Sequence, residues 1–165
     1  MVRKPRGFTL IELLIVVAII GIIAAIAIPN LMLAIERGRQ KRAMGEVRGV
    51  STAIYSFSTD YSRFPLGSGA YAPVASISEY QQLAPGFIKS VPEKDPWSVE
   101  YEYGSEDTGL NFALRSKGKG GLGDPPDFPD VLSSTVSGFH CFECDIVWVN
   151  SSFMFYPEGK QRVCE

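Results

Sequence analysis

An apolar stretch near the N-terminus limits what this chain can fold into. The 21 residues from 8 to 28 include only two polar side chains, Thr9 and Glu12. About 20 helical residues span the hydrocarbon core of a bilayer, so the stretch can form a transmembrane helix. Three basic residues within the first six favour a cytoplasmic N-terminus, although four more cations between residues 37 and 42 weaken that orientation.

The rest of the chain has the composition of a globular protein. Residues 30 to 165 are enough to bury a modest hydrophobic core. A content of 45% hydrophobic and 21% charged residues excludes a disordered polymer. With 16 basic and 18 acidic residues, the chain has no basic field that could bind nucleic acid. One globular region attached to one membrane segment fits these numbers.

Two ordinary interpretations of the apolar stretch are a cleaved secretory signal and a plain anchor. Ala25-Ile26-Ala27 has the small-x-small pattern that signal peptidase reads. A cleaved signal would release a binding domain, whereas a plain anchor would hold a binding domain or an enzyme at the membrane. No recognisable catalytic constellation is present, so an enzyme is not expected. Glu12 argues against both interpretations, because a carboxylate in a membrane helix costs free energy without helping an anchor.

The segment Gly7-Phe8-Thr9-Leu10-Ile11-Glu12-Leu13 resembles the leader of type IV pilins and type II secretion pseudopilins. The resemblance implies that a prepilin peptidase cuts between Gly7 and Phe8 and methylates the new amine of Phe8. It also implies that Glu12 pairs with this amine on a neighbouring subunit as a filament grows. An ammonium at the edge of a low-dielectric helix bundle attracts an opposite charge, which gives the acid a use.

The helix predicted from the apolar stretch continues far into the chain. Apolar residues recur at three- and four-residue steps from Val47 to Tyr61, which predicts one long helix as far as about Thr59. Gly21 and Pro29 interrupt its first half. The resemblance implies that the stretch between them bends or melts on assembly, and the alternative is that both are ordinary residues of a membrane helix.

The C-terminal part has the pattern of strands and turns. A short helix is predicted near residues 79–83, a hairpin over 99–103 and 110–114, and a second strand pair over 146–149 and 153–156. We therefore predict an α+β, pilin-like fold, in which a long N-terminal helix, half transmembrane and half amphipathic, packs on a small antiparallel β-sheet head. Its parts are a leader (1–7), a transmembrane and assembly helix (8–29), the amphipathic helix of the head (30–64) and a globular β-region (65–165).

Asp95-Pro96-Trp97 followed by Tyr101 and Tyr103 resembles a signature of the major pseudopilins of type II secretion. Ser98 stands where that branch has Gly. The resemblance implies a non-enzymatic subunit of a type II secretion pseudopilus, and the alternative is a major or minor pilin of a type IV pilus.

The same resemblance implies the partners and the location of the chain. The partners are further copies in a homopolymeric filament, prepilin peptidase, an inner-membrane assembly platform, minor pseudopilins and the membrane itself. Before assembly the chain is expected to cross the inner membrane once, with its head in the periplasm. After assembly it is expected in a periplasmic or cell-surface filament.

Calcium is the one ligand that the resemblance raises, because a Gly- and Asp-rich loop near the C-terminus binds it in that branch; no cofactor is otherwise required. Hard cations take six to eight oxygen ligands. The candidate ligands are Asp124, Asp127, Asp130 and Asp145. Lys117, Lys119 and a different spacing favour a loop that is only solvated.

The three cysteines, Cys141, Cys144 and Cys164, all lie near the C-terminus. A membrane leader would bring this end out of the cytoplasm, where disulfides persist. The resemblance implies a C-terminal disulfide. Closing Cys141 or Cys144 to Cys164 would pin the tail by about 3 kcal/mol and leave one thiol over.

Overall fold

A computed structural model describes residues 7–121 and 126–162 of the chain. Its elements, in chain order, are α1 (Leu10–Tyr61), β1 (Ala72–Pro73), η1 (Val74–Ser76), α2 (Ser78–Gln81), β2 (Glu102–Ser105), β3 (Phe112–Ser116), η2 (Asp130–Ser133), β4 (Ser137–Cys141), β5 (Ile146–Val149) and β6 (Ser152–Arg162). The chain divides into two compact units, residues 1–36 and residues 37–165. We call the second unit the head.

The first unit contains the N-terminal part of α1, and its apolar side chains are exposed. Phe8 is 74% exposed and Ile22 is 66% exposed. Among the helices that the structure describes, α1 is the one long and apolar enough to cross a membrane. Helix α1 runs through Gly21 and Pro29 to Tyr61, which confirms the predicted long helix. Apolar side chains exposed over such a length need lipid or protein to cover them.

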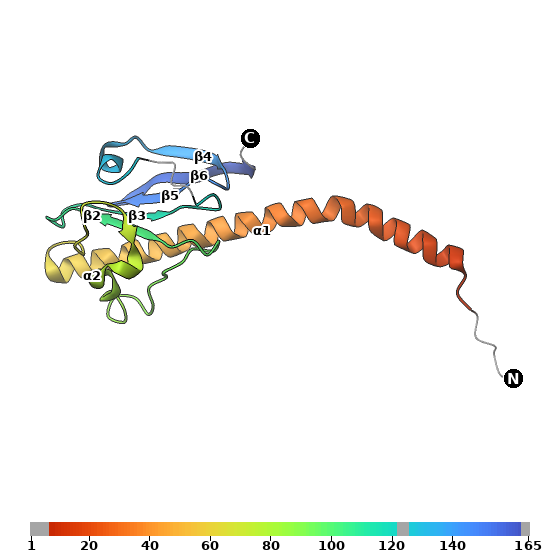
Figure 1. Cartoon of the computed structure of the whole chain (residues 1–165), viewed down its shortest axis with the longest axis horizontal. Helices are drawn as coiled ribbons and strands as arrows, with labels where there is room; N and C mark the ends of the chain where they lie inside the picture. Colours follow the sequence, from red (N-terminus) through yellow and green to blue (C-terminus); the bar gives the residue numbers. More distant parts are fainter. Residues whose placement is uncertain (1–6, 122–125, 163–165) are drawn as a thin grey trace. The chain divides into compact units, whose positions relative to one another are not determined.

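The head contains a six-stranded sheet in the order β1-β2-β3-β5-β6-β4 (Figure 1). Both predicted strand pairs are present, with β2 and β3 two to three residues further along than predicted. The predicted antiparallel sheet is confirmed for four of its five strand pairs, and the exception is β4, which lies parallel to β6. Strand β6 lies between β5 and β4 in the sheet. The chain reverses between β4 and β5, and β6 runs antiparallel to β5, so β4 and β6 point in the same direction.

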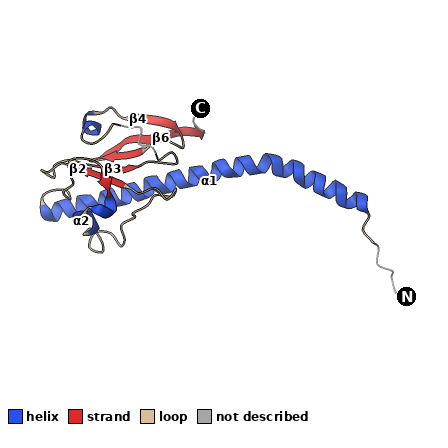
Figure 2. Cartoon of the chain, in the orientation of Figure 1, coloured by secondary structure: helices blue, strands red, loops and turns tan. Residues whose placement is uncertain are grey.

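The core of the head lies between α1 and one face of the sheet. Helix α1 contributes Val47, Val50, Ile54 and Phe57, all at most 1% exposed and at the predicted helical steps. Figure 1 shows the C-terminal part of α1 along this face, and Figure 2 shows that the long connection from α2 to β2 is mostly loop. These four apolar residues therefore form the face of the helix that packs on the sheet.

A second, smaller cluster covers the opposite face of the sheet. Phe128 and Val131, from the segment around η2, pack on Val147 and Val149 of β5. Successive side chains of a strand point to opposite faces. In β3, Phe112 and Leu114 therefore join the core under α1, whereas Ala113 joins the second cluster. The next residue on that second face is Arg115.

Three polar contacts join α1, or the segment just after it, to residues in the sheet or next to it. They are Gln40 Nε2 to Gln161 Oε1 (3.3 Å), the Tyr101 hydroxyl to Glu46 Oε2 (2.8 Å) and the Tyr103 hydroxyl to the Pro65 carbonyl, just after the helix (2.7 Å). Burial raises the pKa of both tyrosines, so each hydroxyl stays a proton donor at neutral pH. These bonds fix the position of the helix along the sheet.

Candidate functional site

The predicted cleavage site lies in an open segment ahead of α1. Gly7 and Phe8 precede the first helical residue, Leu10. Both are exposed, and a Cβ built on Gly7 would meet no atom within 4 Å. A peptidase could therefore reach the bond between them without unfolding the helix. Residues 1–6 of the predicted leader lie outside the described residues.

Glu12 has a local partner that the sequence reasoning missed. Its Oε2 accepts hydrogen bonds from the Thr9 backbone N–H (2.9 Å) and hydroxyl (2.7 Å), while the Glu12 N–H donates to the Thr9 hydroxyl (3.3 Å). This reciprocal arrangement is a capping box, and Thr-x-x-Glu ahead of an apolar run is its sequence signal. The carboxylate is thereby held at the N-terminal end of α1, against Thr9. Thr9 directly follows Phe8, whose amine cleavage would create.

The two predicted flexible positions lie in regular helix. Pro29 lies inside α1, where its missing N–H removes one internal hydrogen bond. Close by, Asn30 Nδ2 donates to the Ile26 carbonyl at 3.1 Å, one residue after the Ala25 carbonyl that the missing N–H of Pro29 would have bonded. Gly21 has open space around it. Bending or melting between Gly21 and Pro29 on assembly stays a prediction.

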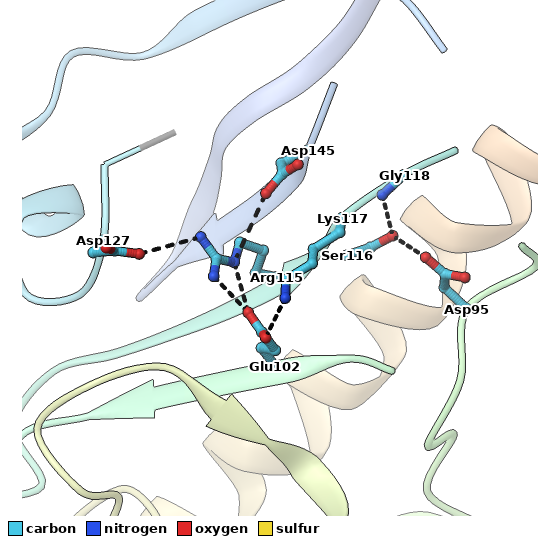
Figure 3. A network of polar contacts seen from close by, with 8 residues as sticks. All are labelled: Asp95, Glu102, Arg115, Ser116, Lys117, Gly118, Asp127 and Asp145. Carbon is cyan, nitrogen blue, oxygen red and sulfur yellow. Dashed lines mark hydrogen bonds and ion pairs between the residues drawn. The ribbon is translucent and has the colours of Figure 1, made fainter. Parts of the chain in front are cut away.

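The Asp95-Pro96-Trp97 segment forms a tight, capped turn. Asp95 Oδ1 accepts from the N–H groups of Trp97 (3.0 Å) and Val99 (2.9 Å), and Oδ2 accepts from the Ser116 hydroxyl (2.8 Å), as Figure 3 shows for the latter. Burial raises the pKa of Asp95, and the three bonds partly offset this. Ser98 has a φ of 69°, a left-handed conformation that glycine adopts more easily. The turn thus keeps the geometry that a Gly at this position serves.

The cysteines pair differently from the prediction. Cys141 and Cys144 form a disulfide with each other across a Cα–Cα distance of 6.0 Å. The predicted bond from either of them to Cys164 is therefore not the pairing found, and Cys164 itself lies outside the described residues. The physical reason is the turn between β4 and β5, which brings its own two ends together while Phe142 is buried between them.

The predicted calcium ligands do not form a common site in the described part of the chain. Asp124 lies outside the described residues. Asp127 Oδ1 and Asp145 Oδ2 face the Arg115 guanidinium, at 3.6 and 3.7 Å (Figure 3). The Asp130 backbone carbonyl accepts hydrogen bonds from the hydroxyls of Ser133 and Ser134. No group of three or more metal-binding side chains free to hold an ion occurs among the described residues. The candidate residues that the structure describes therefore fit a guanidinium and not a calcium ion.

Glu102 completes this polar network on the second face of the sheet. It binds both Arg115, at 2.5 Å from Nη2, and Lys117, at 2.6 Å from Nζ. Burial by itself would raise the pKa of Glu102, but the hydrogen bonds from Lys117 and Arg115 outweigh it and lower the pKa. The carboxylate is consequently ionised at neutral pH. No pattern in the sequence pointed to Arg115.

Comparison with known proteins finds two family models along the chain. The prokaryotic N-terminal methylation motif matches residues 2–28, and type II secretion system protein G matches residues 30–131. The first match covers the predicted cleavage site and the assembly helix. The second covers the head from its helix to η2. No solved structure matches the chain.

Curated relatives agree along most of their length, and each is named type II secretion system core protein G. The relative from Dickeya chrysanthemi is 30% identical over 77% of this chain and 86% of its own length. The relative from Vibrio cholerae serotype O1 is 34% identical over 76% of this chain and 90% of its own length. The relative from Klebsiella michiganensis is 28% identical over 82% of this chain and 96% of its own length. From its N-terminal motif, its pilin-like head and these relatives, the chain belongs to the type II secretion system protein G family, a family of structural pseudopilins and not of enzymes.

Proposed function

We propose that prepilin peptidase cuts this chain between Gly7 and Phe8, and that the mature chain polymerises through α1 into the pseudopilus of a type II secretion system. The exposed apolar surface of α1 from Leu10 to Ile35 carries the proposal. Lipid covers that surface in a single chain, and helices of other copies cover it in a filament. Contacts between copies that do not close into a ring generate such a filament.

This function places the chain in the inner membrane before assembly, with its head in the periplasm. The N-terminal methylation motif and the apolar helix support this placement. The partners are prepilin peptidase, an inner-membrane assembly platform, minor pseudopilins and further copies of the chain. A disulfide in the head also supports a periplasmic location, because disulfides persist outside the reducing cytoplasm.

Glu12 is proposed to pair with the new amine on Phe8 of a neighbouring copy. Two unit charges 4 Å apart attract each other by about 4 kcal/mol at an effective dielectric constant of about 20. Removing one partner of a buried pair costs about 3–5 kcal/mol, because the remaining charge has no compensation. A helix cap contributes only about 1 kcal/mol. The capping role and the pairing role of Glu12 therefore differ enough in size to be separated.

Two matched variants separate these roles. Glu12→Gln keeps an acceptor for the capping box but removes the charge, whereas Thr9→Val removes the capping hydroxyl and keeps the charge. We expect Glu12→Gln to lose filaments, seen by electron microscopy, while Thr9→Val still forms them. Normal filaments from Glu12→Gln would refute the pairing. Equal loss from both variants would leave Glu12 with its capping role alone.

The mature N-terminus tests the processing step. Mass spectrometry of the assembled protein is expected to find a chain that begins at a methylated Phe8. A chain that begins at Ile28 would indicate signal-peptidase cleavage, and an intact Met1 an uncut anchor.

The N-terminal methylation motif is also shared by type IV pilins, which is why a surface pilus remains the second candidate. The match to protein G favours the pseudopilus. Electron microscopy of intact cells separates the two. Short filaments confined to the periplasm support the pseudopilus, and long external fibres support the pilus.

A further inference from the structure

Arg115 places a cation in the interior of the head. Its side chain is only 7% exposed. A guanidinium stays charged in proteins, and burying it costs free energy unless anions and hydrogen-bond acceptors surround it. The surroundings of Arg115 therefore have to supply compensating charge.

Three carboxylates, drawn in Figure 3, and one aromatic ring surround the guanidinium. Glu102 Oε2 accepts hydrogen bonds from Nε at 2.9 Å and from Nη2 at 2.5 Å. Asp127 Oδ1 lies 3.6 Å from Nη1, and Asp145 Oδ2 lies 3.7 Å from Nε. The centre of the Tyr71 ring lies 4.0 Å from Cζ, which adds a cation–π contact. The guanidinium is thus enclosed by groups that favour its charge.

The three carboxylates come from segments far apart in the sequence. Glu102 begins β2, Asp127 precedes η2, and Asp145 precedes β5. The Asp145 side chain has no exposed area, so it needs a cation close by. A cation that gathers carboxylates from separate segments is what a calcium ion does in a protein. Arg115 does the same with a side chain of the protein.

A divalent ion would compete with Arg115 for the same oxygens. Calcium takes oxygen ligands at about 2.3–2.6 Å, on carboxylates that already lie 2.5–3.7 Å from the guanidinium nitrogens. Lys117 adds a second positive charge, 2.6 Å from Glu102 Oε1. Two cations thus already offset most of the charge of the three carboxylates, so a calcium ion would gain little attraction unless it displaced a nitrogen donor.

The neighbouring loop is also held by the protein's own groups. The N–H of Lys119 donates to the Phe142 carbonyl at 3.1 Å. Phe142 is 1% exposed, and the Cys141–Cys144 disulfide closes the turn that contains it. The start of the β3–η2 connection is therefore fastened to the β4–β5 turn by a backbone hydrogen bond, and the disulfide holds that turn closed.

We propose that the guanidinium of Arg115 takes the place of a divalent cation in this head, so that the head is stable without calcium. This inference does not rest on cleavage or polymerisation. It concerns what binds the segments bearing Glu102, Asp127 and Asp145 together.

The test uses the full chain in detergent micelles and the fluorescence of its two tryptophans, Trp97 and Trp148, which both lie in the head. Urea midpoints are measured in calcium chloride and in the chelator EGTA. The wild-type midpoint is expected to be the same in both. A wild-type midpoint that rises in calcium would overturn the proposal, whatever the variants do.

Two variants test the role of the guanidinium itself. Arg115→Gln is expected to unfold at lower urea in EGTA and to recover part of that loss in calcium, because the three carboxylates then lack their central cation. If the urea midpoint of Arg115→Gln is lowered and calcium does not restore any of it, the proposal that the guanidinium takes the place of a divalent cation is overturned. Arg48→Gln is the matched control, since Arg48 also lies over an aromatic ring, that of Phe153, but is exposed. It should leave both midpoints unchanged.

Discussion

Replacing Asp95 with Ala should be the most damaging single change in the loop before β2. Asp95 is 5% exposed, and its carboxylate accepts three hydrogen bonds, from the N–H groups of Trp97 and Val99 and from the hydroxyl of Ser116. Removing an acceptor costs about 1–3 kcal/mol for each buried donor left behind. The low end of that range applies, because water can enter a turn at the surface. We expect a loss of about 3 kcal/mol in the free energy of unfolding.

Asp95→Asn is the control for this prediction. Asn keeps the Oδ1 acceptor for both N–H groups, and its amide can donate to the Ser116 oxygen. The change to Asn also removes the carboxyl group of Asp95, whose pKa is raised because burial disfavours its charged form. We therefore expect Asn to cost less than about 1 kcal/mol, within the usual range for a replaced hydrogen bond.

Urea unfolding of the full chain, followed by tryptophan fluorescence, measures both variants. The predicted order is wild type close to Asn and well above Ala. A loss of under about 1 kcal/mol for Ala would show that the three bonds add little to stability, and the reasoning from hydrogen-bond counts would then fail. An Asn variant as unstable as Ala would instead show that the negative charge, and not the acceptor geometry, stabilises the turn.

Two further predictions concern the head. The hydrogen bond from Arg63 lowers the pKa of Glu79 below 4.5, so this pair stabilises the head above that pH and its contribution is lost as the pH falls. The urea midpoint measured at decreasing pH should therefore fall less steeply in Glu79→Gln than in the wild type. An unchanged slope would contradict this prediction. Ile54→Ala should cost about 2–5 kcal/mol, because Ile54 has no exposed area in the core; Ile35→Ala, at a position 48% exposed, should leave the same urea midpoint unchanged.

The parts of the fold that were predicted correctly depend on local periodicity. The apolar steps through Val47, Ile54 and Phe57 predicted the helix and the face that it buries, because every third or fourth residue shares one side. The strand pairs around β2–β3 and β5–β6 followed from alternation and intervening turns. The assignment to structural pseudopilins also followed from local motifs, and the protein G match confirms it.

The parts that were missed depend on contacts between distant residues. Nothing in the sequence near Arg115 indicates that Glu102, Asp127 and Asp145 meet there, because the three carboxylates come from separate segments of the chain. The parallel position of β4 has the same cause. The capping box is different, since Thr9 and Glu12 carry its signal in four residues.

The three polar contacts between helix and sheet have a mechanical consequence. Gln40, Glu46 and the Pro65 carbonyl are tied to Gln161, Tyr101 and Tyr103 at separate heights. Sliding the helix lengthwise relative to the sheet would stretch all three at once, and it would also disturb the apolar side chains packed between them. A force applied along α1 at Gln40 would therefore move the sheet together with the helix.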